Sequence, residues 1–458
     1  MRLNEVDLNG NGELTFRFRN IGKMLEYKEL ENLEIYFCPF DMEDDVLEGS
    51  LNLYWKGDEI LWDNFIGHYF IVFYTQYIIL ILSDDEERKI PQKINWRLFR
   101  SDFNMDGLIH ELLDKPIVKL IKTLAMNKEH KVGSDELLLY LNLLHNSIIE
   151  IVGRINGANM ATLKDKEMVE YMKFEDDMNW DETKESGLFR ILNQLYQRQK
   201  EKIDSQKLPD WQRWLLLEFP NKYFDVLEDM VFPKWYIASF CKNCTNTRNW
   251  AQYGDSNKGV CLIYRTHQGA LGRGLQLKTC HEYSSDKGKI FNNHIEPLHN
   301  VEYSAEYPEI NFFEMLGNLP GKMIDEWFHD SKGNASKYYI KRNSGQDWQR
   351  WHGEYWELFQ KIVMHKGEDW KGLEEERIIL ENSMLVDYEY EPSERKIKYD
   401  FDELQGIIWG CSVKNAQKEE IRSIINKLCT ITGRTDFEFY QAVKDPSSHE
   451  IWIEKEIY

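Results

Sequence analysis

Residues 236–264, YIASFCKNCTNTRNWAQYGDSNKGVCLIY, contain two strand-like runs separated by a short polar segment. The first run ends at Ser239, and a turn rich in small polar residues leads into the second. Between the runs, Trp250 and Tyr253 are spaced to share one face of a short helix. A serine hydroxyl at a strand end beside aromatic side chains is a common lining for a cleft. The alternative is that Ser239 caps a local turn and that both aromatic residues belong to the core.

The composition is that of a folded, acidic protein. The 458 residues include 15 Trp, 24 Tyr and 23 Phe, and 42% of the chain is hydrophobic, which favours a folded chain over a disordered one. The net charge of -21 argues against an extended nucleic-acid surface, because such binding depends on clustered Lys and Arg. Seven scattered cysteines indicate no disulfide framework, and the first residues lack a secretory signal pattern. We therefore expect a cytoplasmic protein with no membrane segment and no bound metal.

Residues 14–19, LTFRFR, alternate as a strand does. Arg17 and Arg19 share one face of this predicted strand, and Phe16 and Phe18 share the other. Two guanidinium groups on one strand face can bind an anion. The alternative is an edge strand whose arginines are solvated.

The middle of the chain is predicted to be mainly helical. Apolar residues recur at three-to-four spacing between residues 57 and 228. The most apolar run, residues 65–82, carries His68, Thr75 and Gln76, so we predict a buried core helix in preference to a membrane span. Residues 278–300 are interpreted as polar connectors.

A second candidate segment lies at residues 370–380, WKGLEEERIIL, where an acidic turn leads into an apolar strand. In an extended chain Glu375 and Arg377 point to the same side. Further strand and helix patterns follow between residues 398 and 458. With strands near both ends and in the middle, and helices between them, the chain is predicted to be α+β.

Several pieces together resemble the bacterial domain-of-unknown-function family 2971 through nearly the whole chain. They are LTFRFR, IYFCPFDMEDDVLEG, WKGDEILWDNFIGHY, YIASF, NWAQYGDSNKGVCLIY, INFFEMLGNLP, DWKGLEEERIIL, LQGIIWG and TDFEFYQA. The chain departs from the family pattern at residues 42–46 where an Asn-Asp-Pro turn is usual, at Asn257 where a His is usual, and at Leu373. Leu373 replaces the first Glu of a Glu-x-Glu-aromatic-Arg motif, while Glu375 and Arg377 keep the second Glu and the Arg.

The order of these motifs resembles, more weakly, the plan of ADP-ribosyltransferases. That resemblance implies that Arg17, with Arg19, holds the phosphate and ribose of NAD, and that Ser239 supports the nicotinamide pocket. It implies that Glu375 hydrogen-bonds the ribose and stabilises an oxocarbenium-like transition state, as carboxylates do in glycoside cleavage. Trp250 and Tyr253 are then candidate cofactor-binding residues. Leu373 weakens the case for modification of a protein arginine.

These observations lead to one architectural and one functional expectation. We expect split, twisted sheets formed by residues 1–56 and 229–458, with residues 57–228 as a helical insertion, and Arg17, Ser239 and Glu375 pointing into one cleft. We expect an enzyme that cleaves NAD or transfers ADP-ribose from it to an unknown macromolecular or small-molecule acceptor. A non-catalytic interaction or sensing module is the main alternative, and a nuclease-type effector is a further one.

Overall fold

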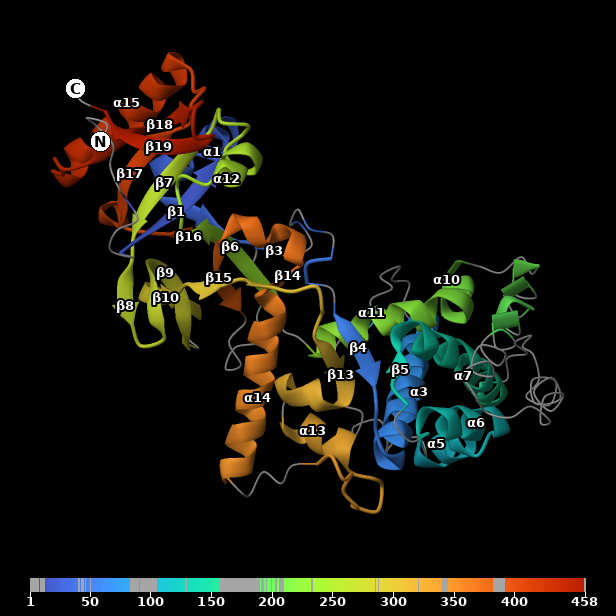
Figure 1. Ribbon diagram of the computed structural model, residues 1–458. Coiled ribbons are helices and arrows are strands. Elements are labelled where there is room, and N and C mark those ends of the chain that lie inside the picture. The colour runs from blue at the N-terminus through green and yellow to red at the C-terminus, as the bar shows by residue number, and fades with distance from the viewer. Residues whose placement is uncertain are drawn as a thin grey trace. The chain divides into compact units, whose positions relative to one another are not determined.

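The two strands predicted on either side of residues 242–259 both pair with the N-terminal strand (Figure 1). β1 (Leu14–Arg19) lies between β6 (Trp235–Cys241) and β7 (Val260–Arg265), antiparallel to both, so that Phe16 is opposite Cys241 on one side and Ile263 on the other. The computed structural model describes residues 13–39, 45, 47–49, 51–82, 105–127, 130–156, 210–231, 234–284, 288–319, 321–339, 345–381 and 392–456, with isolated positions between them.

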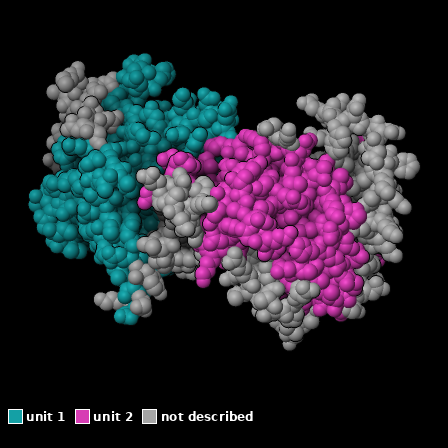
Figure 2. All heavy atoms as spheres, turned by 90° about the horizontal axis from the view of Figure 1, so that it is seen from below, with its two compact units in different colours: residues 1–50, 234–307, 360–458 teal, residues 51–233, 308–359 magenta. Residues whose placement is uncertain are grey.

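The chain divides into two compact units, coloured separately in Figure 2. Unit 1 comprises residues 1–50, 234–307 and 360–458, and unit 2 comprises residues 51–233 and 308–359. The helical insertion predicted over residues 57–228 falls in unit 2, but that unit also contains residues 308–359. The reason is a long-range pairing, because β13 (Glu309–Asn311) runs parallel to β4 (Asn52–Trp55). Residues 157–189 of the predicted insertion lie outside the described residues.

Unit 1 is α+β, with two larger sheets. The first has the order β11-β15-β6-β1-β7-β17-β18-β19, with β3 also paired to β6, and the second has the order β10-β9-β16-β2, with β8 paired to β9. Their remaining strands are β2 (Glu34–Tyr36), β3 (Cys38–Pro39), β8 (His267–Gly269), β9 (Gly272–Ser284), β10 (Gly288–Pro297), β11 (His299–Asn300), β15 (Glu375–Glu381), β16 (Lys396–Lys398), β17 (Leu404–Trp409), β18 (Glu438–Asp445) and β19 (Glu450–Lys455). A two-stranded ladder joins β12 (Glu302–Tyr303) and β14 (His365–Lys366).

One face of the first sheet packs toward the second sheet. Phe240 and Leu262 from the first sheet share a buried apolar cluster with Leu277 and Ile397 from the second. The helices of unit 1 are α1 (Ile21–Glu26), α2 (Glu29–Asn32), α12 (Thr247–Gln252), η4 (Glu368–Leu373), η5 (Phe401–Glu403) and α15 (Asn415–Thr432). Of these, α1, α2, η5 and α15 contribute to the same cluster through buried apolar residues. The face of the first sheet that points toward the second sheet is called the inner face below.

The interpretation of residues 278–300 as polar connectors is wrong, since β9 and β10 form a long antiparallel hairpin over this stretch. Leu275 and Leu277 point into the core, whereas most of β10 is exposed. A hairpin with one solvated face needs few apolar residues. The polar side chains of that face conceal the strand pattern in the sequence.

The opposite, outer face of the first sheet packs on α12. Phe16, Phe18, Cys241 and Trp250 belong to a second buried cluster, and the rings of Phe18 and Trp250 meet edge to face with centroids 4.9 Å apart. The side chain of Asn246 caps α12 by accepting from the Arg248 N–H at 2.9 Å. Close packing then requires a glycine before β7, because a Cβ at Gly259 would lie 2.4 Å from the Arg19 carbonyl oxygen.

Unit 2 is mainly helical around one long apolar helix. Its elements are β4, α3 (Glu59–Leu82), α5 (Met105–Leu113), α6 (Pro116–Ala125), β5 (Val132–Gly133), α7 (Ser134–Ile155), α10 (Asp210–Arg213), η2 (Trp214–Glu218), α11 (Phe219–Val231), β13, η3 (Phe312–Asn318), α13 (Gly321–Phe328) and α14 (Gly345–Val363) up to residue 359. Most of α3 is buried among aromatic side chains, which confirms the predicted core helix. Within the described part of the chain, no helix is both long enough and apolar enough to cross a membrane.

Two histidines are buried in unit 2 with tyrosine partners. His68 Nδ1 lies 2.7 Å from Tyr223 Oη, and His145 Nδ1 lies 2.9 Å from Tyr69 Oη. Burial lowers the pKa of His68 to about 3 and that of His145 to about 4. Both imidazoles are therefore neutral in the folded protein at neutral pH.

Candidate functional site

Ser239 and Glu375 lie next to each other on the outer face of the first sheet. β15 pairs antiparallel with β6, and the register places Glu375 opposite Cys241 and Arg377 opposite Ser239. The Ser239 hydroxyl donates a hydrogen bond of 2.6 Å to Glu375 Oε1. Ser239 lies inside β6 and is half-buried, and Glu375 is 3% exposed. The structure thus brings together two of the three residues that the sequence placed in one site.

Arg17 does not join them, so the prediction of one cleft containing all three residues is wrong. Phe16 is paired with Cys241 and packs on the outer face, and alternation along β1 directs Arg17 to the inner face. There the guanidinium donates to the Tyr36 carbonyl oxygen at 3.1 Å and lies 5.6 Å from the ring centroid of Phe240. Burial, with the neighbouring charge of Arg19, lowers the pKa of Arg17. A substrate held by Ser239 and Glu375 would therefore have the sheet between itself and Arg17.

The other predicted NAD-binding residues are also engaged elsewhere. Arg19 donates two hydrogen bonds to the carboxylate of Glu29, one of them 2.9 Å long. Trp250 is fully buried and donates to the Cys244 carbonyl oxygen at 2.7 Å. Tyr253 is partly buried and packs against the same cluster as Trp250. Trp250 is therefore a core residue, as the alternative interpretation held, and Tyr253 lies at the edge of that core.

The carboxylate of Glu375 is held by two cations as well as by Ser239. Arg377 Nε donates to Glu375 Oε1 at 2.7 Å, and Lys366 Nζ donates to Glu375 Oε2 at 3.1 Å. Both cations also contact Glu48, Lys366 at 3.2 Å and Arg377 through Nη2. The side chains of the four charged residues are 0–3% exposed. We call Glu48, Lys366, Glu375 and Arg377 the buried charge cluster.

Electrostatics keep the carboxylate of Glu375 ionised. Burial by itself would raise its pKa, but the charges of Arg377 and Lys366 outweigh burial and lower the pKa to about 2. Two carboxylates and two cations give the cluster no net charge. Among the described residues, Glu375 Oε1 accepts two hydrogen bonds and Oε2 accepts one. A carboxylate has about four acceptor positions, so these three hydrogen bonds do not use all of them.

Aromatic side chains border the buried charge cluster. Tyr303 Oη accepts a hydrogen bond of 2.9 Å from the Glu375 backbone N–H, and Lys366 Nζ lies 5.0 Å from the ring centroid of Trp370. Tyr303 and Trp370 are both half-buried. Burial raises the pKa of the Tyr303 hydroxyl, which therefore stays protonated. The site therefore consists of the buried charge cluster with the partly exposed rings of Tyr303 and Trp370 beside it.

No sequence motif marks Glu48 or Lys366 as a site residue. Glu48 lies in the segment IYFCPFDMEDDVLEG and Lys366 lies just before DWKGLEEERIIL, so both occur in or beside segments that carry the family resemblance. Glu48 is more than 300 positions from both of its partners, and Lys366 lies nine residues before Glu375 on a separate strand. The sequence contains no local pattern that pairs them. Arg377 was recognised on the same strand face as Glu375, which the structure confirms.

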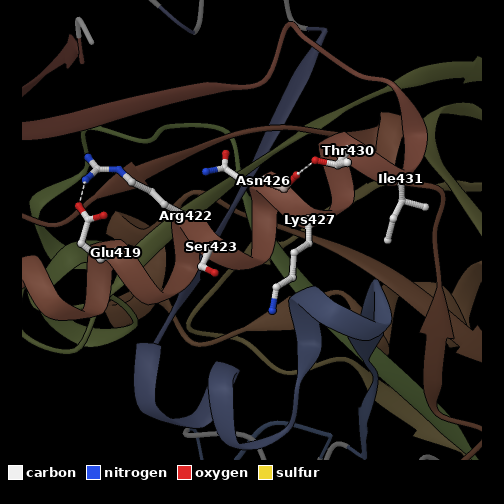
Figure 3. Close-up of a pocket in the computed structure, with 7 residues that line it drawn as sticks. All are labelled: Glu419, Arg422, Ser423, Asn426, Lys427, Thr430 and Ile431. Carbon is white, nitrogen blue, oxygen red and sulfur yellow. Dashed lines mark hydrogen bonds and ion pairs between the residues drawn. The ribbon is translucent and has the colours of Figure 1, made fainter.

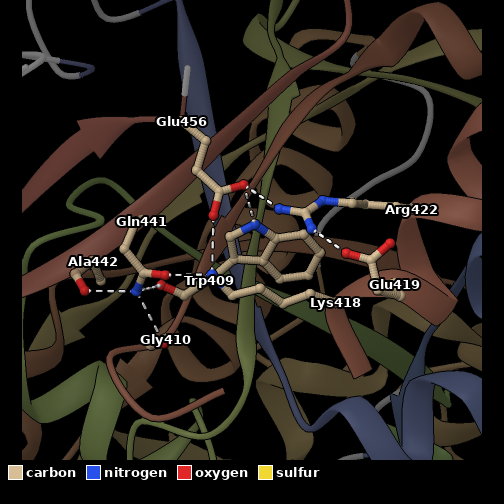
Figure 4. Close-up of polar contacts among 8 residues, drawn as sticks. All are labelled: Trp409, Gly410, Lys418, Glu419, Arg422, Gln441, Ala442 and Glu456. Carbon is tan, nitrogen blue, oxygen red and sulfur yellow. Dashed lines mark hydrogen bonds and ion pairs between the residues drawn. The ribbon is translucent and has the colours of Figure 1, made fainter. Parts of the chain in front are cut away.

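Unit 1 has two other polar features, a hollow along α15 and a cluster around Glu456, and neither is as suited to catalysis as the buried charge cluster. An open hollow of about 720 Å³ lies along α15 (Figure 3), lined by Glu419, Arg422, Ser423, Asn426, Lys427, Thr430 and Ile431. These side chains come from one helix, and five of the seven are exposed polar residues. A second cluster surrounds Glu456, which accepts hydrogen bonds from Trp409, Lys418 and Arg422 (Figure 4). It joins the end of the last strand to α15 and β17.

Within the described residues, groups of three or more His, Cys, Asp or Glu side chains with metal-binding geometry are absent. Comparisons with family models, with curated proteins and with solved structures give no match to this chain.

Proposed function

We propose that the protein transfers a glycosyl group from NAD, either to water or to an acceptor, at the Ser239–Glu375 pair. The observation that carries this proposal is the 2.6 Å hydrogen bond from the Ser239 hydroxyl to a glutamate whose pKa is about 2. An ionised, oriented carboxylate is the group that glycosyl transfer needs on the sugar. The resemblance of the motif order to ADP-ribosyltransferases agrees with this choice.

The proposed chemistry breaks the bond between the ribose C1′ and the nicotinamide nitrogen. The electron pair of that bond goes to the ring nitrogen, which loses its positive charge, and the ribose becomes oxocarbenium-like. A ribose hydroxyl donates to the carboxylate of Glu375, and the negative carboxylate stabilises the developing positive charge. Ser239, Arg377 and Lys366 keep the carboxylate in place and ionised. Water or another nucleophile then attacks C1′ and gives up a proton.

The test uses two neighbouring glutamates that point to opposite faces of one strand. Glu375→Gln keeps the size of the side chain and removes the charge, so nicotinamide release from labelled NAD is expected to fall about a hundredfold or more, on the order of 3 kcal/mol of transition-state stabilisation. Glu376→Gln is the matched control. Glu376 is also buried and paired with a cation, Arg273, but it lies on the inner face with Thr15.

Three outcomes decide the proposal. A loss confined to Glu375→Gln, with both variants folded by circular dichroism, supports it. Equal losses in both variants would mean that the effect is structural. Absence of nicotinamide release from the wild type, with and without cell lysate as a source of acceptor, would overturn the proposal.

Arg17 gives an independent check of the revised site. Since Arg17 lies on the inner face, Arg17→Met is expected to leave the KM for NAD unchanged within about twofold. An increase in KM of tenfold or more would return Arg17 to the substrate site.

A non-catalytic interaction or sensing module is the second candidate, and a specific observation favours it. The buried charge cluster is neutral and its side chains are at most 3% exposed, which are also the properties of a purely structural ion-pair network. Under this interpretation the wild type releases no nicotinamide, and Glu375→Gln changes stability alone.

A further inference from the structure

β14 carries two adjacent side chains to opposite sides of its ladder. β12 and β14 are parallel, with Tyr303 opposite Lys366 and Glu302 opposite His365. Lys366 reaches Glu375, on the side where Tyr303 accepts from the Glu375 N–H. Because neighbouring strand residues alternate, His365 points away from the buried charge cluster. Its ring contacts Tyr307, with centroids 4.3 Å apart and the planes tilted by 54°.

His365 is buried without the hydrogen bonds that its imidazole can make. It is 6% exposed, and neither Nδ1 nor Nε2 has a hydrogen-bond partner among the described residues. Burying an unpaired polar group costs about 1–3 kcal/mol, and buried polar groups without partners are rare in folded proteins. A leucine of similar size would avoid that cost, so the imidazole at this position calls for a functional explanation.

The surroundings of His365 define the chemistry of a ligand that would satisfy it. A neutral imidazole has one donor and one acceptor nitrogen, which match a carboxamide or hydroxyl group. Burial raises the pKa of the neighbouring Tyr307, and the charges of Asp45 and Glu48 add to that effect. Glu48 is already balanced by Lys366 and Arg377, but the negative charge of Asp45 disfavours an anionic ligand such as a phosphate. The ring of Tyr307 is half-buried and offers a surface for stacking.

We propose that His365 and Tyr307 form a binding subsite for a neutral group that both donates and accepts hydrogen bonds, a carboxamide or a sugar hydroxyl. The subsite lies on the other side of β14 from Glu375, and it deepens the proposed function by naming a second point at which the substrate or acceptor is held. His365 binds and positions this group. Access requires the partly exposed ring of Tyr307 to rotate.

Three variants of the full chain test this subsite. His365→Leu removes both hydrogen-bonding atoms, and His365→Gln restores one donor and one acceptor on a side chain of similar reach. The control is His267→Leu in the same unit, because His267 Nε2 already lies 2.7 Å from Glu403 Oε2. Each protein is melted without ligand and titrated by calorimetry with two probes, nicotinamide for the carboxamide and ribose for the hydroxyl.

We expect His365→Leu to melt at or above the wild-type temperature, because no hydrogen bond among the described residues is lost. We expect His267→Leu to melt at a lower temperature, because its contact with Glu403 is lost. We also expect one of the two probes to bind the wild type, to bind His365→Leu at least tenfold more weakly, and to bind His365→Gln within about fivefold of wild type. The probe that binds identifies the ligand group.

Two results would overturn the subsite. One is equal probe binding by the wild type and His365→Leu, or no binding of either probe to the wild type. The other is a His365→Leu variant that melts several degrees lower, which would mean that the imidazole already has a structural partner. Failure of the proposed function looks different, because the wild type would then release no nicotinamide from NAD while His365-dependent probe binding persisted.

Discussion

Unit 1 contains two ion-pair clusters that differ in their exposure to water. In the buried charge cluster the side chains of Glu48, Lys366, Glu375 and Arg377 are at most 3% exposed. In the cluster around Glu456, the side chains of Lys418 and Arg422 are 12% and 18% exposed and that of Glu456 is 19% exposed (Figure 4). Each cluster joins elements from distant parts of the chain.

The difference shows what each cluster can do. The Glu456 cluster places Lys418 and Arg422 over the ring of Trp409, at 5.5 and 5.6 Å from its centroid, and fixes the last strand to α15. Partial solvation makes such contacts weak and tolerant of loss. The buried cluster keeps a carboxylate ionised where water is excluded, which is a property of catalytic sites and also makes the loss of one member costly.

Removing one member of the buried cluster should therefore have the largest effect. Arg377→Leu leaves Glu48 and Glu375 with one cation between them, so unfolding by urea should show a loss on the order of 3–5 kcal/mol. Arg422→Leu in the partly solvated Glu456 cluster should cost less, about 1 kcal/mol. Equal losses in the two variants would contradict the distinction between the clusters.

Acid should separate the contributions of unit 1 and unit 2. The pKa of Glu375 is lowered from its ordinary value of 4.5 to about 2. Its contribution to stability is therefore fully present above pH 4.5 and is lost as the pH falls toward 2, on the order of 3 kcal/mol in total. In unit 2, the pKa values of His68 and His145 are lowered from 6.5 to about 3 and about 4. Their contribution to stability is fully present above pH 6.5 and is lost as the pH falls below that value.

Urea unfolding between pH 7 and pH 2 measures both windows. Between pH 7 and pH 5 the two histidines together should lower the free energy of unfolding by on the order of 4 kcal/mol. Over the same range Glu375 should contribute almost no pH dependence. Glu375→Gln should reduce the pH dependence below 4.5, where the Glu375 and histidine windows overlap, and leave the dependence between pH 6.5 and 4.5 unchanged. A variant whose curve stays parallel to that of the wild type below pH 4.5 would refute the lowered pKa of Glu375.

The smallest effect is expected from salt acting on the Glu456 cluster. Glu456→Gln should cost at most about 1 kcal/mol in dilute buffer, and less in 1 M NaCl, because partly exposed charges are screened. The corresponding difference for Arg377→Leu should change little with salt, since mobile ions do not enter the buried cluster. Urea unfolding at two ionic strengths checks both expectations, and a strong salt effect on Arg377→Leu would indicate that the buried cluster is hydrated.

Local patterns in the sequence were sufficient for most of the elements that hold the site. The alternation of LTFRFR, the strand ending near Ser239 and the apolar run after Glu375 correspond to β1, β6 and β15. The serine and glutamate were predicted to share a site, and they are in hydrogen-bond contact. These predictions depend on side-chain period and turn residues, which neighbouring residues determine.

What could not be predicted depends on register between distant segments. Alternation shows that Arg17 and Phe16 point to opposite sides of a strand, but not which of them faces Glu375. That choice follows from the pairing of Phe16 with Cys241, which joins residues more than 200 positions apart. A shift of one residue would exchange the two faces. Glu48 was missed for the same reason, since its partners Lys366 and Arg377 lie more than 300 positions away. Lys366 was missed because it precedes the strand that carries Glu375 and Arg377 and shares no side-chain period with them.

The central position of β1 has a consequence for the order of synthesis. β1 ends at residue 19, and its neighbour β7 ends at residue 265. A ribosome adds about 5–20 residues per second, so β1 has left the ribosome on the order of 10 to 50 seconds before both neighbouring strands exist. During that time the apolar side chains of Phe16 and Phe18 lack their native cover, and the nascent chain presents an unpaired strand. An unpaired apolar strand of this kind is prone to aggregate until β6 and β7 cover it.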